Sequence, residues 1–588
     1  MDKMTGTTAD AATRVTKSLG DAKAWRSVNW AEAEADVRRL RQRIFKAAQD
    51  GDAKRLRNLQ KLMLRSRHNT VVSIRRVTQL SQGRRTPGVD GKVALSDQDR
   101  GQLLRELEAA PRCRPVPVRR VHIPKANGKL RPLGIPTIRD RVEQARVKNA
   151  LEPEWEALFE ERSYGFRPGR SCHDAVGRIH TTMSRKDAKR TWVLDADLTS
   201  AFDRVNHDRL LDAIGDFPAR REIQGWLTAG VMEQGRFAPT EGGTPQGGVI
   251  SPLLLNITLH GMGNAAGDID RQPIWQKTAH VTPTFVRYAD DFVAMCATEE
   301  QAYTVKQRLA EWLEPRGLAF NDEKTRVVHI DEGFDFLGFH VRRFDGKLLT
   351  KPSREAVKRF KEKVTAISME MATAKTADVI RRLNPLIKGW STYYRGAAAS
   401  KVFGDLGHWM YIRMFRWAKR RHPKKSTAWI QDNYFGAFHP HRKDNWVFGD
   451  KETGAYLVKP SWTHIVRHTV VTGAASPDDP SLVDYWAGRR NKRKLPEAHG
   501  RKVVGMAARQ KGLCPLCGTD LIAGVGYEPE SVREWANWFS ANFRHLHKHH
   551  LIYRSRGGSD QVNNLVLIHS DCHRKHHASD HKELQEIA

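Results

Sequence analysis

Two adjacent carboxylates and one distant aspartate are the residues of this sequence best suited to metal chemistry. Asp290 and Asp291 stand between two apolar runs, and Asp197 ends a third. A bare Asp-Asp pair is commonly a solvated surface turn, since adjacent carboxylates repel each other unless a cation lies between them. Aspartates at the ends of neighbouring strands, however, suit two-metal phosphoryl transfer, and Mg²⁺ prefers such hard oxygen ligands. The sequence therefore predicts a Mg²⁺ centre at Asp197, Asp290 and Asp291.

A second set of metal-ligand residues lies between positions 514 and 572. Cys514 and Cys517 have CxxC spacing, and His569 and Cys572 have HxxC spacing. Three thiolates and one imidazole can close a tetrahedral Zn²⁺ site, and we hypothesise that His569 is the fourth ligand. Six Cys in 588 residues do not make a disulfide framework, so the clustering favours a structural metal site.

The chain carries a large excess of positive charge. With 99 Lys+Arg against 67 Asp+Glu the formal net charge is +32, which points to a polyanionic partner, nucleic acid before an acidic membrane surface. The 39% hydrophobic content excludes a mostly disordered basic tail. No run of about 18 apolar residues occurs and no signal peptide is recognisable, so we expect no membrane span and a cytoplasmic protein.

The elements that must position these residues follow from periodicity. Residues 118–345 indicate mixed α/β structure, with strands at 121–123 and 192–194 and a hairpin at 285–295 around the acidic pair. Residues 353–420 indicate helices, with Ser353 as a helix N-cap. Apolar residues also recur at helical spacing near the N-terminus: Val37, Leu40, Ile44, Leu56, Leu59 and Leu62.

Six blocks of the sequence resemble, in order, those of the reverse transcriptases encoded by group II introns, which also act as maturases. The fifth block is the Tyr-Ala-Asp-Asp box, and the third, around Asp197, is less Lys/Gly-rich than the usual family spelling. The blocks are 123–136, 163–171, 197–203, 243–248, 288–291 and 317–339. The resemblance implies a right-hand polymerase with Asp197, Asp290 and Asp291 as its catalytic, Mg²⁺-binding triad.

The resemblance also implies a set of residues around the dNTP substrate. Phe202 is similar to the residue that blocks a ribose 2′-hydroxyl, although core packing is its alternative role. Gln246 is similar to the polar contact to the nascent base pair. The cations expected near the triphosphate are Lys125, Arg131 and Lys324.

Residues 383–395 resemble the signature of the maturase domain, which implies binding of intron RNA and assistance in its splicing. Pro385 predicts an interrupted helix. The aromatic side chains of Trp390, Tyr393 and Tyr394 suit stacking on RNA bases, and helix packing is the alternative for each of them.

Residues near the C-terminal end resemble the HNH endonuclease domain that many group II intron proteins carry, with a ββα-metal fold around one Mg²⁺-class ion. His550 would be the general base and Asn564 would fix the loop that orients it. The metal would be held by His549, His573 and His577, with His545, His547 and His576 as alternatives. A structural zinc module that binds DNA without cutting it is the rival explanation.

The expected protein is a multidomain retroelement enzyme that would bind group II intron RNA, assist splicing, nick target DNA and copy the intron into cDNA on an RNA–DNA hybrid. Its expected parts are a basic helical extension (1–100), fingers and palm (101–345), an α-helical thumb or maturase domain (346–425), a basic DNA-binding region (426–505) and the HNH domain (506–588). The rivals are a maturase with relic enzymatic domains and a host-domesticated reverse transcriptase. Whether the protein is a monomer or a dimer stays open.

Overall fold

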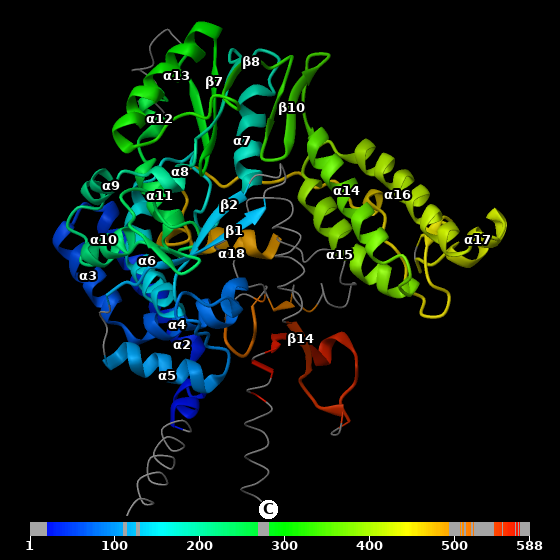
Figure 1. The fold of residues 1–588 in the computed structure, drawn as a ribbon, viewed down its shortest axis with the longest axis horizontal. Helices are drawn as coiled ribbons and strands as arrows, with labels where there is room; N and C mark the ends of the chain where they lie inside the picture. Colours follow the sequence, from blue (N-terminus) through cyan, green and yellow to red (C-terminus); the bar gives the residue numbers. More distant parts are fainter. Residues whose placement is uncertain are drawn as a thin grey trace, which may run out of the picture.

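A four-stranded antiparallel sheet with the strand order β6-β7-β3-β8 organises the palm (Figure 1). Its strands are β3 (Trp192–Asp197), β6 (Thr284–Tyr288), β7 (Asp291–Cys296) and β8 (Arg326–His329). Alternate residues of these strands pack on α7 on one face and on α11 and α13 on the other. Because helices cover both faces, the strands are mostly apolar, with Arg287 of β6 and Asp195 of β3 as charged residues inside them.

The computed structural model describes most of the chain. The described residues are 20–109, 114–124, 130–268, 281–440, 442–492, 506, 509–510, 513–518, 521, 546–554, 557–570, 572–573 and 576. Among them, no helix combines the length and the apolar character needed to cross a membrane. The palm helices are α7 (Cys172–Met183), α8 (Ala201–Arg204), α9 (His207–Ile214), α10 (Arg220–Thr228), α11 (Ser251–Thr258), α12 (Met262–Ala265) and α13 (Glu299–Leu313).

The N-terminal helices and the fingers lie below the palm in the view of Figure 1. The helices are α2 (Trp30–Gln49), α3 (Ala53–Arg65), α4 (Arg67–Arg75), α5 (Asp97–Ala109) and α6 (Ile138–Leu158). The second sheet has the order β2-β1-β4-β5, with β1 (Val118–Pro124), β2 (Leu130–Ile135), β4 (Val231–Glu233) and β5 (Arg236–Ala238). The expected apolar face of α3 is confirmed at Leu56 and Leu59, whereas Leu62 is 49% exposed and Met63 is buried in its place.

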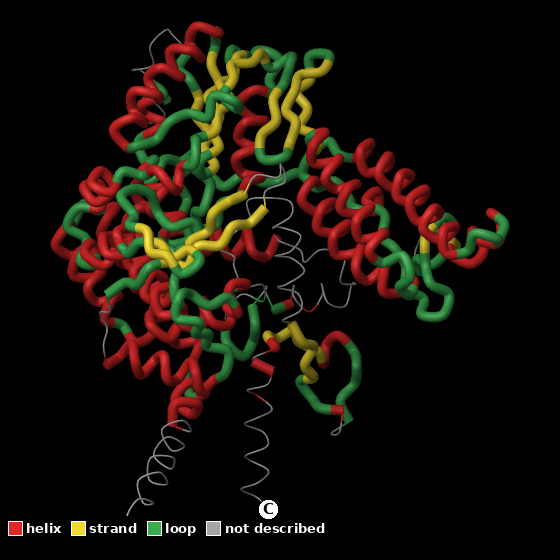
Figure 2. The backbone as a smooth tube through the Cα atoms, viewed as in Figure 1, coloured by secondary structure: helices red, strands yellow, loops and turns green. Residues whose placement is uncertain are grey.

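The thumb stands apart from the N-terminal helices and consists of three long helices (Figure 2). They are α14 (Arg354–Glu370), α15 (Thr376–Tyr394) and α16 (Ser400–Arg421), preceded by the sheet of β9 (Phe334–Phe336), β10 (Phe339–Phe344) and β11 (Lys347–Pro352). Ser353 caps α14 as expected, since its side chain accepts a hydrogen bond from the Ala356 N–H.

The expected interruption at Pro385 is wrong, because α15 runs through it. A proline removes one N–H, which leaves the carbonyl of the residue four positions earlier without its helical donor. That residue is Arg381, which lies on the exposed face, where water can serve the carbonyl. The neighbouring Asn384 side chain fixes the same turn by bonding to Tyr456 O and Val458 N at 2.9 Å each.

The chain returns from the thumb to the palm in a segment that we call the strap, residues 463–489. Before it come α17 (Thr427–Tyr434), β12 (Phe435–Gly436) and β13 (Val447–Phe448), and it ends within α18 (Val483–Lys492). The strap is held by His468, whose Nε2 lies 2.8 Å from Asp174 Oδ1, and by Asp478, which forms a buried ion pair with Arg41 at 2.6 Å. Because α18 extends to Lys492, the basic run that begins at Arg489 starts inside this helix.

The C-terminal module contains a two-stranded antiparallel hairpin, β14 (Leu546–His550) paired with β15 (Leu565–His569). Apolar residues of β15 join a hydrophobic core that also takes members from α4, α5 and α6 and from the residues before and at the start of α2. Segments almost 500 residues apart in the sequence therefore share one core.

Candidate functional site

The three predicted aspartates meet at one end of the palm sheet. Asp197 is the last residue of β3 and is the register partner of Asp291, the first residue of β7. Asp290 lies in the tight turn between β6 and β7, next to Ala289, whose φ of 57° reverses the chain. The hairpin and the neighbouring strand thus present three carboxylates together.

The electrostatics of this centre favour a cation. Burial raises the pKa of Asp291 well above its usual range, and the charges of Asp290 and Asp197 raise it further. The pKa of Asp290 is raised by burial and by Asp197. Lys324 contacts the Asp197 carboxylate directly. Carboxylates forced together in this way are relieved by a bound cation, and the all-oxygen donor set fits Mg²⁺.

The catalytic hairpin rests on a polar network that sequence reasoning missed. A Cβ on Gly165 would lie 2.3 Å from the Ala289 nitrogen, so the two backbones touch and only glycine fits. Asn256, 1% exposed, donates from Nδ2 to Gly165 O at 2.8 Å and accepts from Arg287 Nη1 at 2.9 Å. Buried polar residues inside the apolar stretches of α11 and β6 were the signal that could have revealed this network.

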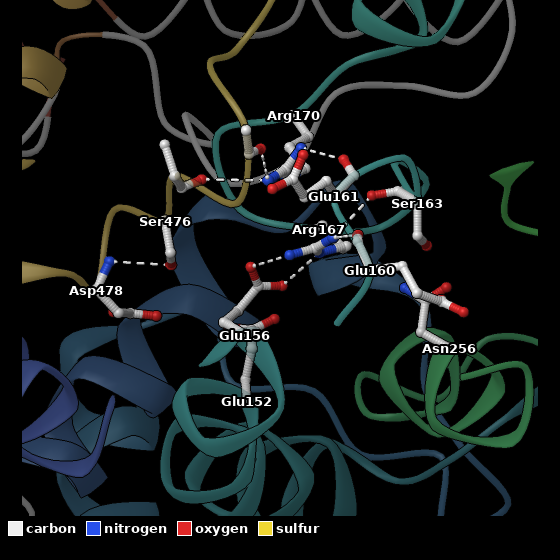
Figure 3. Close-up of polar contacts among 12 residues, drawn as sticks. Glu152, Glu156, Glu160, Glu161, Ser163, Arg167, Arg170, Asn256, Ser476 and Asp478 are labelled. Atoms are coloured by element: carbon white, nitrogen blue, oxygen red, sulfur yellow. Dashed lines mark hydrogen bonds and ion pairs between the residues drawn. The ribbon is translucent and has the colours of Figure 1, made fainter. Parts of the chain in front are cut away.

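Figure 3 shows how the segment around Gly165 is itself anchored. Arg167 is fully buried and forms two hydrogen bonds of 3.0 Å with the Glu156 carboxylate. Arg170 donates to Glu161 O and, on the strap, to Gly473 O, both at 2.8 Å. Arg167 and Arg170 therefore hold the backbone of this block in place beneath the hairpin.

The residues expected near the dNTP surround the same centre. Phe202 is half-buried and meets Phe166 edge-on, with ring centroids 6.0 Å apart. Gln246 Nε2 lies 3.4 Å from Asp203 Oδ2, which links the Gly243–Gly248 loop to α8. Arg131 is exposed on β2, and its charge lowers the pKa of Asp290, which burial and Asp197 otherwise raise. Lys125 lies outside the described residues.

The aromatic residues of the maturase signature do not offer their faces to a ligand. Trp390, Tyr393 and Tyr394 are buried, and the two tyrosine hydroxyls donate to Leu337 O and Gly338 O at 2.9 and 3.0 Å. The expectation that these rings stack on RNA bases is therefore wrong. The alternative, helix–helix packing, holds for Trp390, whose ring packs on Phe360 of α14 and Phe403 of α16. The two tyrosine rings pack instead on Phe339 of β10.

The Cys/His cluster is assembled as the spacing suggested. The Sγ atoms of Cys514, Cys517 and Cys572 and a ring nitrogen of His569 all lie within 4.8 Å of one another, and all four residues are buried. The pKa of Cys517 lies far below its usual range, because Cys514, Cys572 and His569 all hydrogen bond to its sulfur. A soft donor set of this composition and compactness fits Zn²⁺.

The nuclease-like hairpin carries a second set of imidazoles. His549 is buried, and the centroid of its ring lies 5.4 Å from the ring centroid of His573 and 4.9 Å from that of His576. His547 lies 5.2 Å from His573, so it also borders the group. The predicted ligand His577 and the alternative His545 lie outside the described residues. The rings of His573 and His576, which come after β15, therefore both lie beside the ring of His549 on β14.

The predicted base and its loop occupy the rim of this group. His550 Nε2 lies 2.7 Å from Asp560 Oδ1, a partner that sequence reasoning missed. Arg554 and His550 lower the pKa of Asp560, which keeps the carboxylate charged. Asn564, 9% exposed, bonds to the N–H and C=O of Ile552 at 2.8 and 2.9 Å. The asparagine thus closes the loop that follows His550.

Comparison with known protein families matches these regions one by one. Residues 25–107 match the N-terminal domain of reverse transcriptase, and 123–341 match reverse transcriptase (RNA-dependent DNA polymerase). Residues 357–435 match the maturase-specific domain of group II introns, and 538–579 match HNH endonuclease. The expectations of a polymerase, a maturase domain and a nuclease in one chain are confirmed.

Curated relatives agree. The protein YkfC of Escherichia coli (strain K12) is 38% identical over 307 residues, which are 46% of this chain and 79% of YkfC. The group II intron-encoded protein LtrA of Lactococcus lactis subsp. cremoris is 29% identical over 286 residues, 39% of this chain and about half (47%) of LtrA. Maturase-like protein 1 of Euglena gracilis is 27% identical over 375 residues, 62% of this chain and 76% of that protein. The chain belongs to the group II intron reverse transcriptase/maturase family and carries an HNH endonuclease domain.

Proposed function

We propose that this protein acts with a group II intron RNA, assists its splicing, nicks target DNA with the HNH module and copies the intron into cDNA from the nicked strand. The observation that carries the proposal is the presence in one chain of three crowded aspartates, a maturase-type thumb and an imidazole-lined hairpin. LtrA, which is 29% identical to this chain over 286 residues, is named as a group II intron-encoded protein.

In the polymerase centre, Asp197, Asp290 and Asp291 would hold two Mg²⁺ ions. Such ions activate a primer 3′-hydroxyl and stabilise the departing pyrophosphate. Phe202 would fill the space of a ribose 2′-hydroxyl and so select dNTPs, with Phe166 packed edge-on against it. Arg131, Lys125 and Lys324 would neutralise the triphosphate, and Gln246 would contact the nascent base pair.

In the nuclease centre, His549, His573 and His577 would hold one Mg²⁺-class ion, with His547 and His576 as neighbouring alternatives. His550 would take a proton from the attacking water. Its Nε2 donates to the charged Asp560, which leaves Nδ1 with the lone pair that a general base needs. Asn564 would keep this loop in register, and Cys514, Cys517, His569 and Cys572 would hold a structural Zn²⁺.

Two hollows of the surface lined by basic side chains are the proposed binding sites for intron RNA and target DNA. A groove of about 640 Å³ between α14 and α16 has the buried Trp417 in its floor and is lined by four arginines, which suit the phosphates of intron RNA: Arg413, Arg416, Arg420 and Arg421. A second hollow of about 490 Å³ lies in the proposed DNA-binding region and combines Trp446 and Trp462 with Arg442 and Lys443. With a net charge of +32, binding should weaken steeply with salt.

Primer extension on an RNA template with dNTPs and Mg²⁺ tests the polymerase, and nicking of a DNA duplex by the protein loaded with its intron RNA tests the nuclease. Both activities are expected from the wild type. A protein without either activity would support the relic maturase, and cDNA synthesis without any DNA nicking would support a domesticated reverse transcriptase.

A further inference from the structure

The Cys/His cluster does not stand alone but is part of the contact between the C-terminal module and the N-terminal helices. One hydrophobic core contains both parts. From the N-terminal side it includes Trp25, Trp30, Val71, Ile74 and Val77, and from the C-terminal side Met506, Cys514, Cys517, Leu565, Leu567, Ile568 and Cys572. Three of the four cluster residues are therefore interface residues, and any change in their charge is felt at the contact.

Arg75 is the charged group of this contact. It ends α4, and its side chain is only 6% exposed. Its Nη2 donates to the sulfur of Cys517 at 3.7 Å, a normal distance for a hydrogen bond to sulfur. Its guanidinium carbon lies 4.6 Å from the centre of the Trp30 ring, which fixes the plane of the group by a cation–π contact. A buried arginine is thus aimed at one of the proposed zinc ligands.

The charge of the cluster explains why a cation belongs there. Zn²⁺ bound by three thiolates and one neutral imidazole carries a net charge of −1, because the two positive charges of the ion meet three negative ones. A net charge that is buried without a partner is costly, and hydrogen bonds to metal-bound thiolates stabilise them. Arg75 supplies both the opposite charge and the hydrogen bond.

Besides the Cys517 sulfur, the carboxylate of Glu34 also lies near Arg75. Glu34 Oε1 lies 3.9 Å from Arg75 Nη1, but the Glu34 side chain is 26% exposed and is therefore partly hydrated. Burial raises the pKa of Glu34, while the charges of Arg75, Arg38 and Arg76 lower it, so this carboxylate has two further cationic neighbours. The buried sulfur of Cys517 has no such access to water, so it depends more than Glu34 does on the hydrogen bond from Arg75.

We propose that Arg75 is the positioning residue through which a bound zinc ion locks the nuclease module onto the N-terminal helices. The inference goes beyond the proposed function, although it rests on the zinc assignment made there. Without zinc the Cys517 sulfur is no longer held in a fixed position, so the hydrogen bond from the buried Arg75 loses its anchored acceptor and the contact between the module and α4 loosens. The metal thus sets the position of the HNH hairpin relative to the polymerase as well as the local fold.

The test compares Arg75→Met, which keeps the length of the side chain and removes its charge, with Arg76→Met, which removes the same charge from the adjacent, exposed position. Full-length proteins are assayed for zinc content and for hydrogen exchange in peptides covering α4 and β15. The wild type is expected to hold one zinc per chain. Arg75→Met is expected to raise exchange in both peptides at least tenfold, Arg76→Met is expected to leave it unchanged, and Arg75→Lys is expected to fall between wild type and Arg75→Met.

Chelation makes the coupling visible without any variant. Removing zinc from the wild type with a strong chelator should raise exchange in α4 as much as Arg75→Met does, and chelating the Arg75→Met protein should add little more in α4. Unchanged α4 exchange after chelation of a zinc-loaded wild type overturns the latch and leaves the zinc site standing. A wild type that holds no zinc overturns both the latch and the zinc assignment, while the polymerase and nuclease assays still decide the proposed function.

Discussion

The proposed polymerase centre and the proposed nuclease centre hold their candidate metal ligands in place in different ways. The palm takes one aspartate from the end of β3 and two from the β6–β7 hairpin, almost 100 residues further along the chain, and buries the supporting network between two layers of helices. The nuclease centre takes its imidazoles from one hairpin and the helical turn that follows it. Each nevertheless uses one buried asparagine, Asn256 or Asn564, to hold the loop that carries reactive groups. The comparison teaches that the residues that hold a site together can come from distant parts of the sequence or from one hairpin, although both sites must fix the positions of their reactive groups.

The largest effect should follow from removing one palm carboxylate. Asp290→Ala is expected to reduce cDNA synthesis by roughly a thousandfold, about 4 kcal/mol of transition-state stabilisation, because the two-metal geometry is lost. DNA nicking should stay at the wild-type level, since the two centres share no residue. Primer extension and plasmid nicking measure the two arms, with the exposed Asp187→Ala as a control. Substantial full-length cDNA from Asp290→Ala would remove this residue from the catalytic set.

The reciprocal change concerns the nuclease base. His550→Ala is expected to lower the nicking rate by roughly a hundredfold or more, the usual contribution of a general base, and to leave primer extension unchanged. Asp560→Asn, which weakens the partner of His550 Nε2, should cost about tenfold in the same assay. Nicking of normal rate by His550→Ala would shift the base to a neighbouring histidine.

The two asparagines offer a matched pair with a smaller expected effect. Asn256→Ala leaves the Gly165 carbonyl and one nitrogen of the buried Arg287 without a partner, which costs about 2 kcal/mol. We expect about a tenfold slower polymerase with a raised Mg²⁺ requirement and unchanged nicking. For Asn564→Ala we expect the opposite pattern: about tenfold slower nicking and unchanged primer extension. If either variant slows both activities equally, the supports are not local to their own centres, and the comparison fails.

The smallest effect concerns the strap, which connects the two regions. Burial alone would raise the pKa of Asp174, but the hydrogen bond and charge of His468, with Ser171 and Val471, lower it to about 2. A folded-state pKa below the ordinary value of about 3.8 adds stability above that pH, which is lost as the pH falls toward 2. The shift corresponds to about 2 kcal/mol in a group that is almost completely buried.

Urea unfolding at pH 6 and pH 3 measures this contribution. Asp174→Asn is expected to be less stable at pH 6 and to lose less stability than the wild type between the two pH values. Both activities should keep their ratio, because the strap touches neither centre. An identical pH dependence in the variant and the wild type would assign the acid sensitivity to other carboxylates.

The sequence was informative where function and local pattern coincide. Asp197, Asp290 and Asp291 were recognisable because apolar strands precede or follow them, and Cys514 and Cys517 because their spacing is short. Asn256, Arg287 and Asp560 were not recognised, since their partners come from chain segments that only the fold brings together. The aromatic residues Trp390, Tyr393 and Tyr394 were misjudged because a sequence shows that a ring is present and not which element covers it.

The strap also changes where one protein of this kind can exchange parts with another. The maturase match ends at residue 435, but the partners of Arg41, Arg170 and Asp174 lie between residues 468 and 478. A recombination event that joined a different downstream region at residue 435 would remove one partner from each of these three residues and leave only the partners within the N-terminal helices and the palm: Glu152 for Arg41, Glu161 O for Arg170 and Ser171 for Asp174. We therefore expect a polymerase exchanged between such proteins to need its own strap, and swaps of nuclease modules to be tolerated best when they join after it.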